Sequence, residues 1–125
     1  MKLYQEELMD HYRYPRNKGR LELPDFVSDV HNPSCGDSIE FQGAIAFDRL
    51  VDVAFQGKGC VISQATASLL SQSCKNQPLK TIKLYDAQFL TSLIAIQLGP
   101  NRLQCALLSL QALQQGIAQF QLKNS

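Results

Sequence analysis

The fold is decided by residues 38–60, which read SIEFQGAIAFDRLVDVAFQGKGC. Apolar residues occupy alternate positions in two successive runs, the first with a glycine in the same phase: Ile39, Phe41, Gly43, Ile45 and Phe47, then Val51, Val53 and Phe55. Such alternation is typical of strands with one buried face. The connection Asp48-Arg49-Leu50 between the runs therefore predicts an antiparallel hairpin.

The end of this stretch predicts a helix. Gly57-Lys58-Gly59 closes the second strand, and residues 61–75 are rich in Ala, Ser, Thr and Leu without a helix breaker. We therefore expect a helix to begin just after Cys60, which places this cysteine at a junction between strand and helix.

The remaining pattern predicts an α+β domain. Residues 3–14 have the apolar spacing of an amphipathic helix that stops at Pro15, and Phe26–His31 is a short strand candidate. Three further helical segments are expected at residues 78–84, at residues 86–96 and from residue 103 onward. Strands grouped early and helices grouped late favour a small antiparallel three-stranded sheet with helices packed on one face, in a single domain spanning residues 1–125.

Composition excludes several classes of function. The formal charge of +1, without a block of like charges, gives no reason to expect nucleic-acid or membrane binding. Acidic residues near the N-terminus do not fit a signal peptide, and no apolar run is long enough to span a bilayer. A cytoplasmic protein is therefore expected. Four scattered cysteines in a reducing compartment are more typical of buried thiols, metal ligands or reactive groups than of disulfides.

The segment around Cys35 offers two ligands. Cys35 and Asp37 are two residues apart, and extended backbone points such side chains the same way. Gly36 between them leaves space for an ion to approach. The same residue types favour an ordinary turn, so the segment by itself does not decide between a loop and a metal site.

The other three cysteines occupy different contexts. A helix N-terminus favours the thiolate of Cys60, although a small buried residue would also suit a tight turn. Cys105 is near the start of the last helix, where Arg102 could lend positive charge, but its apolar flanks suit a core residue. Cys74 is expected in the core or at the surface without a role.

Together, Cys35, Asp37, Cys60 and Cys105 make a candidate set of three sulfurs and one oxygen. Zinc accepts such ligands, and thiolates also hold iron-sulfur clusters, so residue types and spacing leave both open. The two histidines give a weaker signal. His11 is expected to be a partly exposed surface residue, and His31 either a strand-end residue or an acid-base group near Cys35.

Four ordered motifs resemble those of the iron-sulfur cluster assembly scaffolds of the NifU N-terminal, IscU and SufU type. They run from the first helix to the last and comprise Asp10-His11-Tyr12 with Pro15-Arg16-Asn17 and Gly19, Asn32-Pro33-x-Cys35-Gly36-Asp37, Gly57-x-Gly59-Cys60 with Ser63 and Ala65, and Arg102-x-x-Cys105. The resemblance implies a SufE/NifU-like fold in which Cys35, Asp37, Cys60 and Cys105 converge at one exposed end.

The resemblance also implies a function. Such proteins receive sulfur from a cysteine desulfurase and pass a [2Fe-2S] cluster to apo-proteins as non-enzymatic scaffolds, or act as zinc-containing sulfur acceptors, with zinc or iron at the same ligands. On this basis Cys105 is the expected sulfur acceptor. The IscU branch has a histidine where this chain has Gln104, and a chaperone motif for an Hsp70-type partner that residues 98–102, LGPNR, match only in part. Arg102 and the absence of that histidine resemble the SufU branch. That branch usually has an insertion between its second and third cysteines, and the interval between Cys60 and Cys105 leaves no room for it.

Three hypotheses follow. The first is a scaffold for cluster assembly, the second is a zinc-bound sulfur acceptor, and the third is a zinc-stabilised interaction domain without sulfur transfer.

Overall fold

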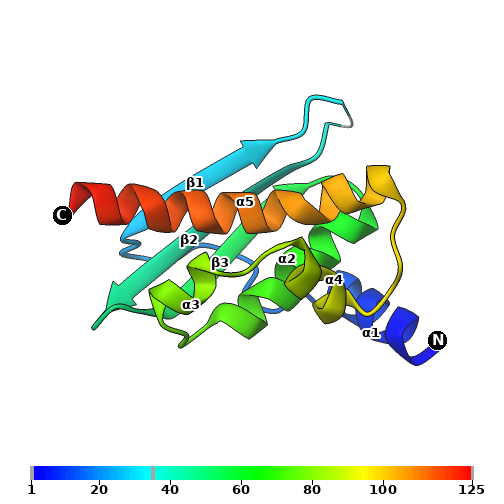
Figure 1. The fold of residues 1–125 in the computed structure, drawn as a ribbon, viewed down its shortest axis with the longest axis horizontal. Coiled ribbons are helices and arrows are strands. Elements are labelled where there is room, and N and C mark those ends of the chain that lie inside the picture. The colour runs from blue at the N-terminus through cyan, green and yellow to red at the C-terminus, as the bar shows by residue number, and fades with distance from the viewer. Residues whose placement is uncertain (1, 35, 125) are drawn as a thin grey trace.

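The computed structural model describes residues 2–34 and 36–124. A three-stranded antiparallel sheet in the order β1-β2-β3 is followed along the chain by helices, as Figure 1 shows. The elements are α1 (Lys2–Arg13), β1 (Phe26–His31), β2 (Ser38–Ala46), β3 (Arg49–Lys58), α2 (Val61–Cys74), α3 (Leu79–Lys83), α4 (Ala87–Ile94) and α5 (Pro100–Lys123). The α+β fold class predicted from the sequence is therefore confirmed.

The inner face of the sheet is the apolar face that the alternation predicted. Phe41 of β2 is the register partner of Phe55 of β3; both rings are fully buried, with centroids 6.0 Å apart. Ile39 and Val53 are buried with them. Alternation places these four side chains on one face, where α2 and α5 cover them.

The turn of the hairpin differs from the prediction. The chain reverses at Phe47 and Asp48, which both have left-handed φ angles, of 53° and 60°, as a two-residue type I′ turn requires. Leu50 belongs to β3 and is fully buried, whereas Phe47 lies at the tip with 98% of its surface exposed. A register irregularity between Ala44 and Ile45 interrupts the alternation in β3, so the prediction that Val51 lies on the buried face is wrong, and its side chain is 40% exposed.

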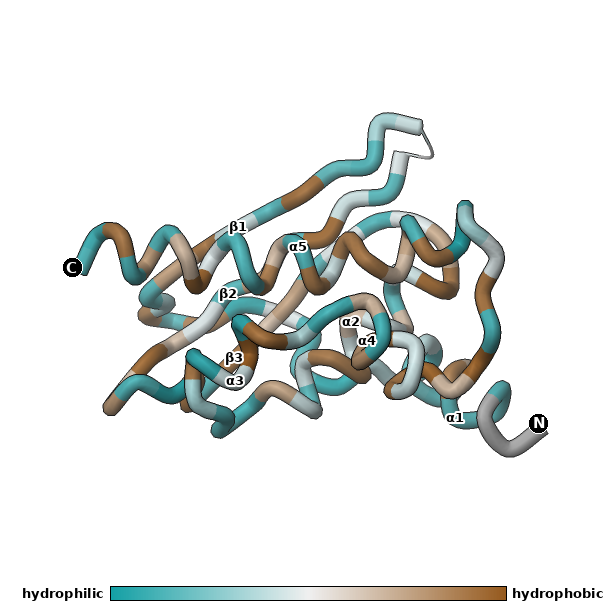
Figure 2. Tube along the Cα trace, viewed as in Figure 1, coloured by the Kyte–Doolittle hydropathy of each residue, from teal (hydrophilic) through white to brown (hydrophobic). Residues whose placement is uncertain are grey.

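Helix α5 packs closely on the sheet. A Cβ atom at Gly116 would overlap the ring of the buried Phe26 of β1, so the absence of a side chain lets the helix approach the strand. Figure 2 shows hydrophobic and hydrophilic residues alternating along α5, as expected of a helix with one face on the sheet. Among the described residues, no helix is both long and apolar enough to cross a bilayer.

The expectation that His11 is partly exposed is wrong. His11 is 3% exposed, and its Nδ1 atom lies 2.7 Å from Oγ of Ser68 in α2. Ser68 Oγ also accepts a hydrogen bond of 2.8 Å from the backbone N–H of Arg16. His11 lies beside the charged Asp10, which suggested a solvated position, and its burial results from contact with Ser68, which is distant in the sequence.

Candidate metal centre

Three separate junctions of the fold supply the candidate ligands. Asp37 directly precedes β2, Cys60 directly precedes the first residue of α2, and Cys105 lies in the second turn of α5. The loop before β2 is closed by backbone hydrogen bonds from Asn32 N–H to the carbonyl of Asp37, 2.8 Å, and from Gly36 N–H to the carbonyl of Asn32, 2.9 Å. These bonds hold Asp37 at the end of the β1–β2 connection.

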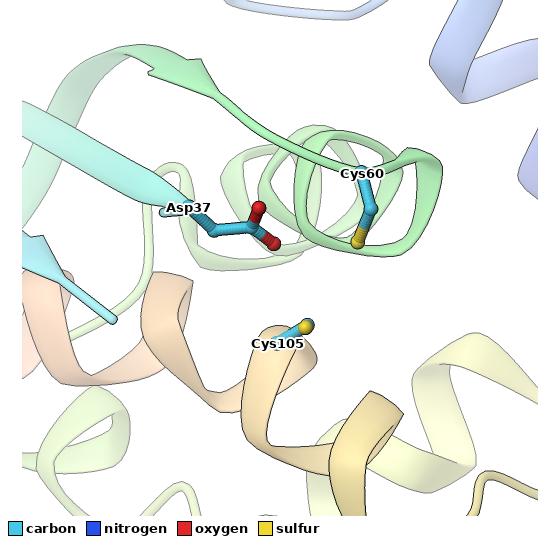
Figure 3. Close-up of side chains that lie close together, drawn as sticks. All are labelled: Asp37, Cys60 and Cys105. Atoms are coloured by element: carbon cyan, nitrogen blue, oxygen red, sulfur yellow. The ribbon is translucent and has the colours of Figure 1, made fainter. Parts of the chain in front are cut away.

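The ligand atoms of Asp37, Cys60 and Cys105 all lie within 4.8 Å of one another, and Figure 3 shows the three side chains directed into a shared space. Asp37 is buried, Cys105 is half-buried and Cys60 is exposed. It is the one such group of metal-ligating side chains in the part of the chain that the structure describes. Cys35, the fourth predicted ligand, lies outside the described residues, so its place in the set stays a prediction.

Asp37 is held as a carboxylate. Burial acts to raise the pKa of Asp37, but hydrogen bonds from the thiols of Cys60 and Cys105, from the Cys60 backbone N–H and from the Ser63 hydroxyl outweigh it and lower the pKa below its usual value. The Oδ2 atom is nevertheless buried without a hydrogen-bond partner among the described residues. A buried, ionised carboxylate oxygen that has no hydrogen-bond donor is a suitable ligand for a cation. Together with the two neighbouring thiols it forms a ligand set that suits zinc or iron.

Cys60 has the helix-terminal position that the sequence predicted, and it is exposed rather than buried. It is the N-cap residue of α2, in extended conformation and without a side-chain cap bond, and its Sγ atom lies 3.8 Å from Oγ of Ser63. The preceding Gly59 has a φ of +140°, and a Cβ atom there would overlap the carboxyl group of Asp37. Glycine is thus what allows Asp37 and Cys60 to approach each other.

Cys105 borders a hollow of about 630 Å³ between α1, the start of α2 and the chain leading into α5. Cys60 and Arg102 line the same hollow, in agreement with the expectation that Arg102 lies near the Cys105 thiol. Leu8 and Met9 of α1 also line it, and sequence reasoning assigned these two only to an apolar helix face. Periodicity identified that face, but nothing local in the sequence shows that it reaches the cysteines.

Cys74 and His31 are not part of this group. Cys74 is fully buried in the core, as one of the two predicted placements required, and burial raises its pKa to about 12. It therefore remains a thiol at neutral pH. His31 is exposed, with Nε2 at 3.1 Å from the Oδ2 atom of Asp29, which favours the strand-end interpretation.

A family model agrees with the motif pattern. The model described as "NifU-like N terminal domain" matches residues 3–125.

Two curated relatives are similar over nearly the whole chain. The zinc-dependent sulfurtransferase SufU of Bacillus subtilis is 36% identical, over 93% of this chain and 90% of that protein. One of the IscU iron-sulfur cluster assembly scaffold proteins of Archaeoglobus fulgidus is 32% identical, over 98% of this chain and 79% of that protein.

The fold itself matches a solved structure. The N-terminal part of a NifU-like protein from Brucella abortus superimposes with a TM-score of 0.77, covering 96% of this chain and 95% of that one. The two sequences are 18% identical, so this similarity concerns the fold.

Proposed function

The chain belongs to the NifU-like N-terminal domain family, and from this premise we propose that it is a scaffold for iron-sulfur cluster assembly. One observation carries the proposal: the ligand atoms of Asp37, Cys60 and Cys105 lie within 4.8 Å of one another although they come from three different elements. Such convergence places thiol and carboxylate ligands around a single space at one end of the domain.

The proposed ligand set is Cys35, Asp37, Cys60 and Cys105. Three thiolates and one carboxylate hold iron during the assembly of a [2Fe-2S] cluster, and the same atoms bind zinc in the resting protein. The unpartnered Oδ2 atom of Asp37 and the exposed position of Cys60 support this set. Bound zinc would fix the ligands and favour the thiolate form of each cysteine.

Cys105 is the proposed sulfur acceptor. Its thiolate attacks the terminal sulfur of a persulfide on a cysteine desulfurase, forming a new S–S bond as the old one breaks, and the donor cysteine leaves as a thiolate. Reduction of the transferred sulfur to sulfide then takes two electrons, which an added dithiol supplies in an assay. The half-buried thiol beside the 630 Å³ hollow, with Arg102 one turn earlier on α5, supports this role.

The zinc-bound sulfur acceptor is the second candidate function. It is favoured by the 36% identity to a relative named as a zinc-dependent sulfurtransferase and by Gln104, which puts a poor metal ligand directly before Cys105. In both functions the proposed sulfur source is a cysteine desulfurase, whereas apo-protein recipients belong to the scaffold alone. The partial match of residues 98–102 leaves an Hsp70-type chaperone as a prediction.

Anaerobic reconstitution separates these functions. The protein is incubated with ferrous iron, cysteine, a dithiol and a catalytic amount of desulfurase. A [2Fe-2S] chromophore that passes to an apo-ferredoxin supports the scaffold. A persulfide on the protein after treatment with desulfurase and cysteine without the dithiol, together with no chromophore from the full mixture at any iron concentration, supports the zinc-bound acceptor. Neither product would refute both functions and leave only a zinc-stabilised interaction domain.

A further inference from the structure

A second hollow, of about 480 Å³, is lined by the segment that leads to Cys60. It is formed by the end of α1, the segment that follows α1, the end of β3 and the first turn of α2. Its charged lining residues are Arg13, Lys18 and Lys58, and no described carboxylate lines it. Below, this hollow is called the cationic hollow.

The three cations are exposed, and none makes an ion pair or a side-chain hydrogen bond with the side chains that the structure describes. Carboxylates do lie nearby, since Glu6 and Asp10 line a hollow with Arg13, and Asp29 and Glu40 line another with Lys18 and Lys58. Asp10 pairs with Arg16 at 2.6 Å, whereas Asp29 contacts His31 and Glu40 accepts a hydrogen bond from Gln42. No described carboxylate lies within ion-pair distance of the three cations, so their charge can attract a molecule from outside.

The cationic hollow borders the metal centre directly. Gly59 lines it, precedes Cys60 in the chain, and lies so close to Asp37 that no side chain fits between them. A molecule bound there would rest beside the ligands through which sulfur or a cluster is exchanged. Charge at such a position steers an oppositely charged partner toward the centre and orients it.

We propose that the cationic hollow, defined by Arg13, Lys18 and Lys58, binds an acidic segment of a protein that docks over the metal centre. That this protein exchanges sulfur or a cluster rests on the proposed function, whereas the binding of an acidic segment rests on the charges alone. Long, exposed side chains from three separate segments of the chain suit carboxylates spaced along a peptide. A phosphate ion is only a few times the roughly 30 Å³ share of one water, so it would fill little of the hollow. Tyr12, with 41% of its surface exposed, adds an apolar contact.

The test uses the zinc-loaded full chain and a fluorescein-labelled peptide of alternating glutamate and aspartate. Fluorescence anisotropy measures its affinity at low salt, with a peptide of alternating glutamine and asparagine as the neutral probe. We expect the acidic peptide to bind, and to lose about fivefold in affinity when salt is raised fourfold. Lys18→Glu and Lys58→Glu should each weaken binding about tenfold.

Lys80→Glu is the matched control, because it makes the same change in net charge at an exposed position on α3, away from the metal centre in Figure 1. It should change the affinity less than twofold. Equal losses in all three variants would show attraction by net charge alone and overturn the proposal. Displacement of the peptide by inorganic phosphate, beyond the effect of sodium chloride at the same ionic strength, would indicate a small-anion site and also overturn it.

Cluster assembly from ferrous iron and free sulfide gives an independent readout, since no protein partner takes part. Lys18→Glu should assemble the cluster as the parent does. If Lys18→Glu loses peptide binding but assembles the cluster normally, the docking site is separate from the metal centre, as proposed. A parent protein that binds the peptide but assembles no cluster would refute only the scaffold function.

Discussion

Asp37 is the proposed ligand that most clearly distinguishes this candidate centre from a stable cluster site. Stable iron-sulfur proteins normally use four thiolates, whereas Asp37 contributes a hard oxygen, and its Oδ2 atom has no other partner among the described residues. We therefore expect Asp37→Cys to hold its cluster longer and to pass it to an apo-ferredoxin about tenfold more slowly. Visible absorbance and circular dichroism under anaerobic conditions measure both rates. Transfer at the parental rate would show that Asp37 does not govern release.

Cys105 and Cys74 allow a matched comparison of two thiols. Cys105 is half-buried beside a hollow, whereas Cys74 is fully buried with its pKa raised to about 12, so it stays protonated and inaccessible. Cys105→Ser should abolish persulfide formation by the desulfurase while the fold survives, and Cys74→Ser should leave it unchanged, with a stability loss of about 1 kcal/mol from the buried hydroxyl. Mass spectrometry after desulfurase treatment locates the sulfur. Finding it on Cys74 would contradict these roles.

At the scale of elements, the junction between β3 and α2 depends on Gly59. Gly59 and Gly19 both have a φ near +140°, but a Cβ atom would meet the carboxyl group of Asp37 only at Gly59, whereas the space around Gly19 is open. Both alanine variants should lose about 1–3 kcal/mol of stability from backbone strain. Only Gly59→Ala should also lose zinc affinity, by about tenfold or more, because its methyl group displaces a ligand. Competition with a zinc-binding dye measures this, and equal zinc affinities would refute the positional role of Gly59.

The docking of α1 on α2 should depend on pH through His11. Burial, and then the positive charge of Arg16, lower the pKa of His11, against smaller raising effects of Glu7 and Asp10. The unfolded chain therefore binds a proton near pH 6.5 while the folded protein does not. Stability is then lost as pH falls below about 6.5 and levels off below the folded pKa.

Urea unfolding of zinc-free protein between about pH 7.5 and 5 tests this expectation. His11→Asn, which keeps a polar partner for Ser68, should reduce the slope of stability against pH, whereas His31→Asn at an exposed position should retain it. An unchanged slope in His11→Asn would assign the acid sensitivity to other groups.

Sequence reasoning succeeded where the determining interactions are local. Alternation from Ile39 to Gly43 predicted the inner face of the sheet, and the glycines before Cys60 predicted where α2 begins. It failed for Phe47, which lies in the turn, and for Val51, because a register irregularity between two strands is not written in either strand alone. It failed for His11 because Ser68 is distant in the chain. The convergence of Asp37, Cys60 and Cys105 came from motif resemblance, since their spacing by itself left turn and core interpretations open.

At the scale of the whole molecule, the proposed metal centre lies where the β1–β2 connection, the start of α2 and the start of α5 meet. Asp37 ends the β1–β2 connection, Cys60 begins α2 and Cys105 belongs to α5, so one ion bound by all three cross-links the sheet to both helices that cover it. Because a ligand that binds only the folded state stabilises it by mass action, zinc at about 100 times its Kd adds about 2.7 kcal/mol. For a chain of this size the change corresponds to roughly 10 °C in Tm.

Zinc removal by a chelator should therefore lower the Tm by about that amount, and readdition of one equivalent should restore it. Asp37→Asn, which is close in shape but lacks the negative charge, serves as the control. Its Tm should respond much less to zinc, whereas Cys74→Ser should respond as the parent does, because Cys74 lies in the core away from the ligands. Thermal unfolding monitored by circular dichroism, with metal content verified at each step, makes the comparison. A parental Tm that stays constant after verified zinc loss would mean that the ion, if it binds, does not cross-link these elements, and the ligand set proposed here would have to be abandoned.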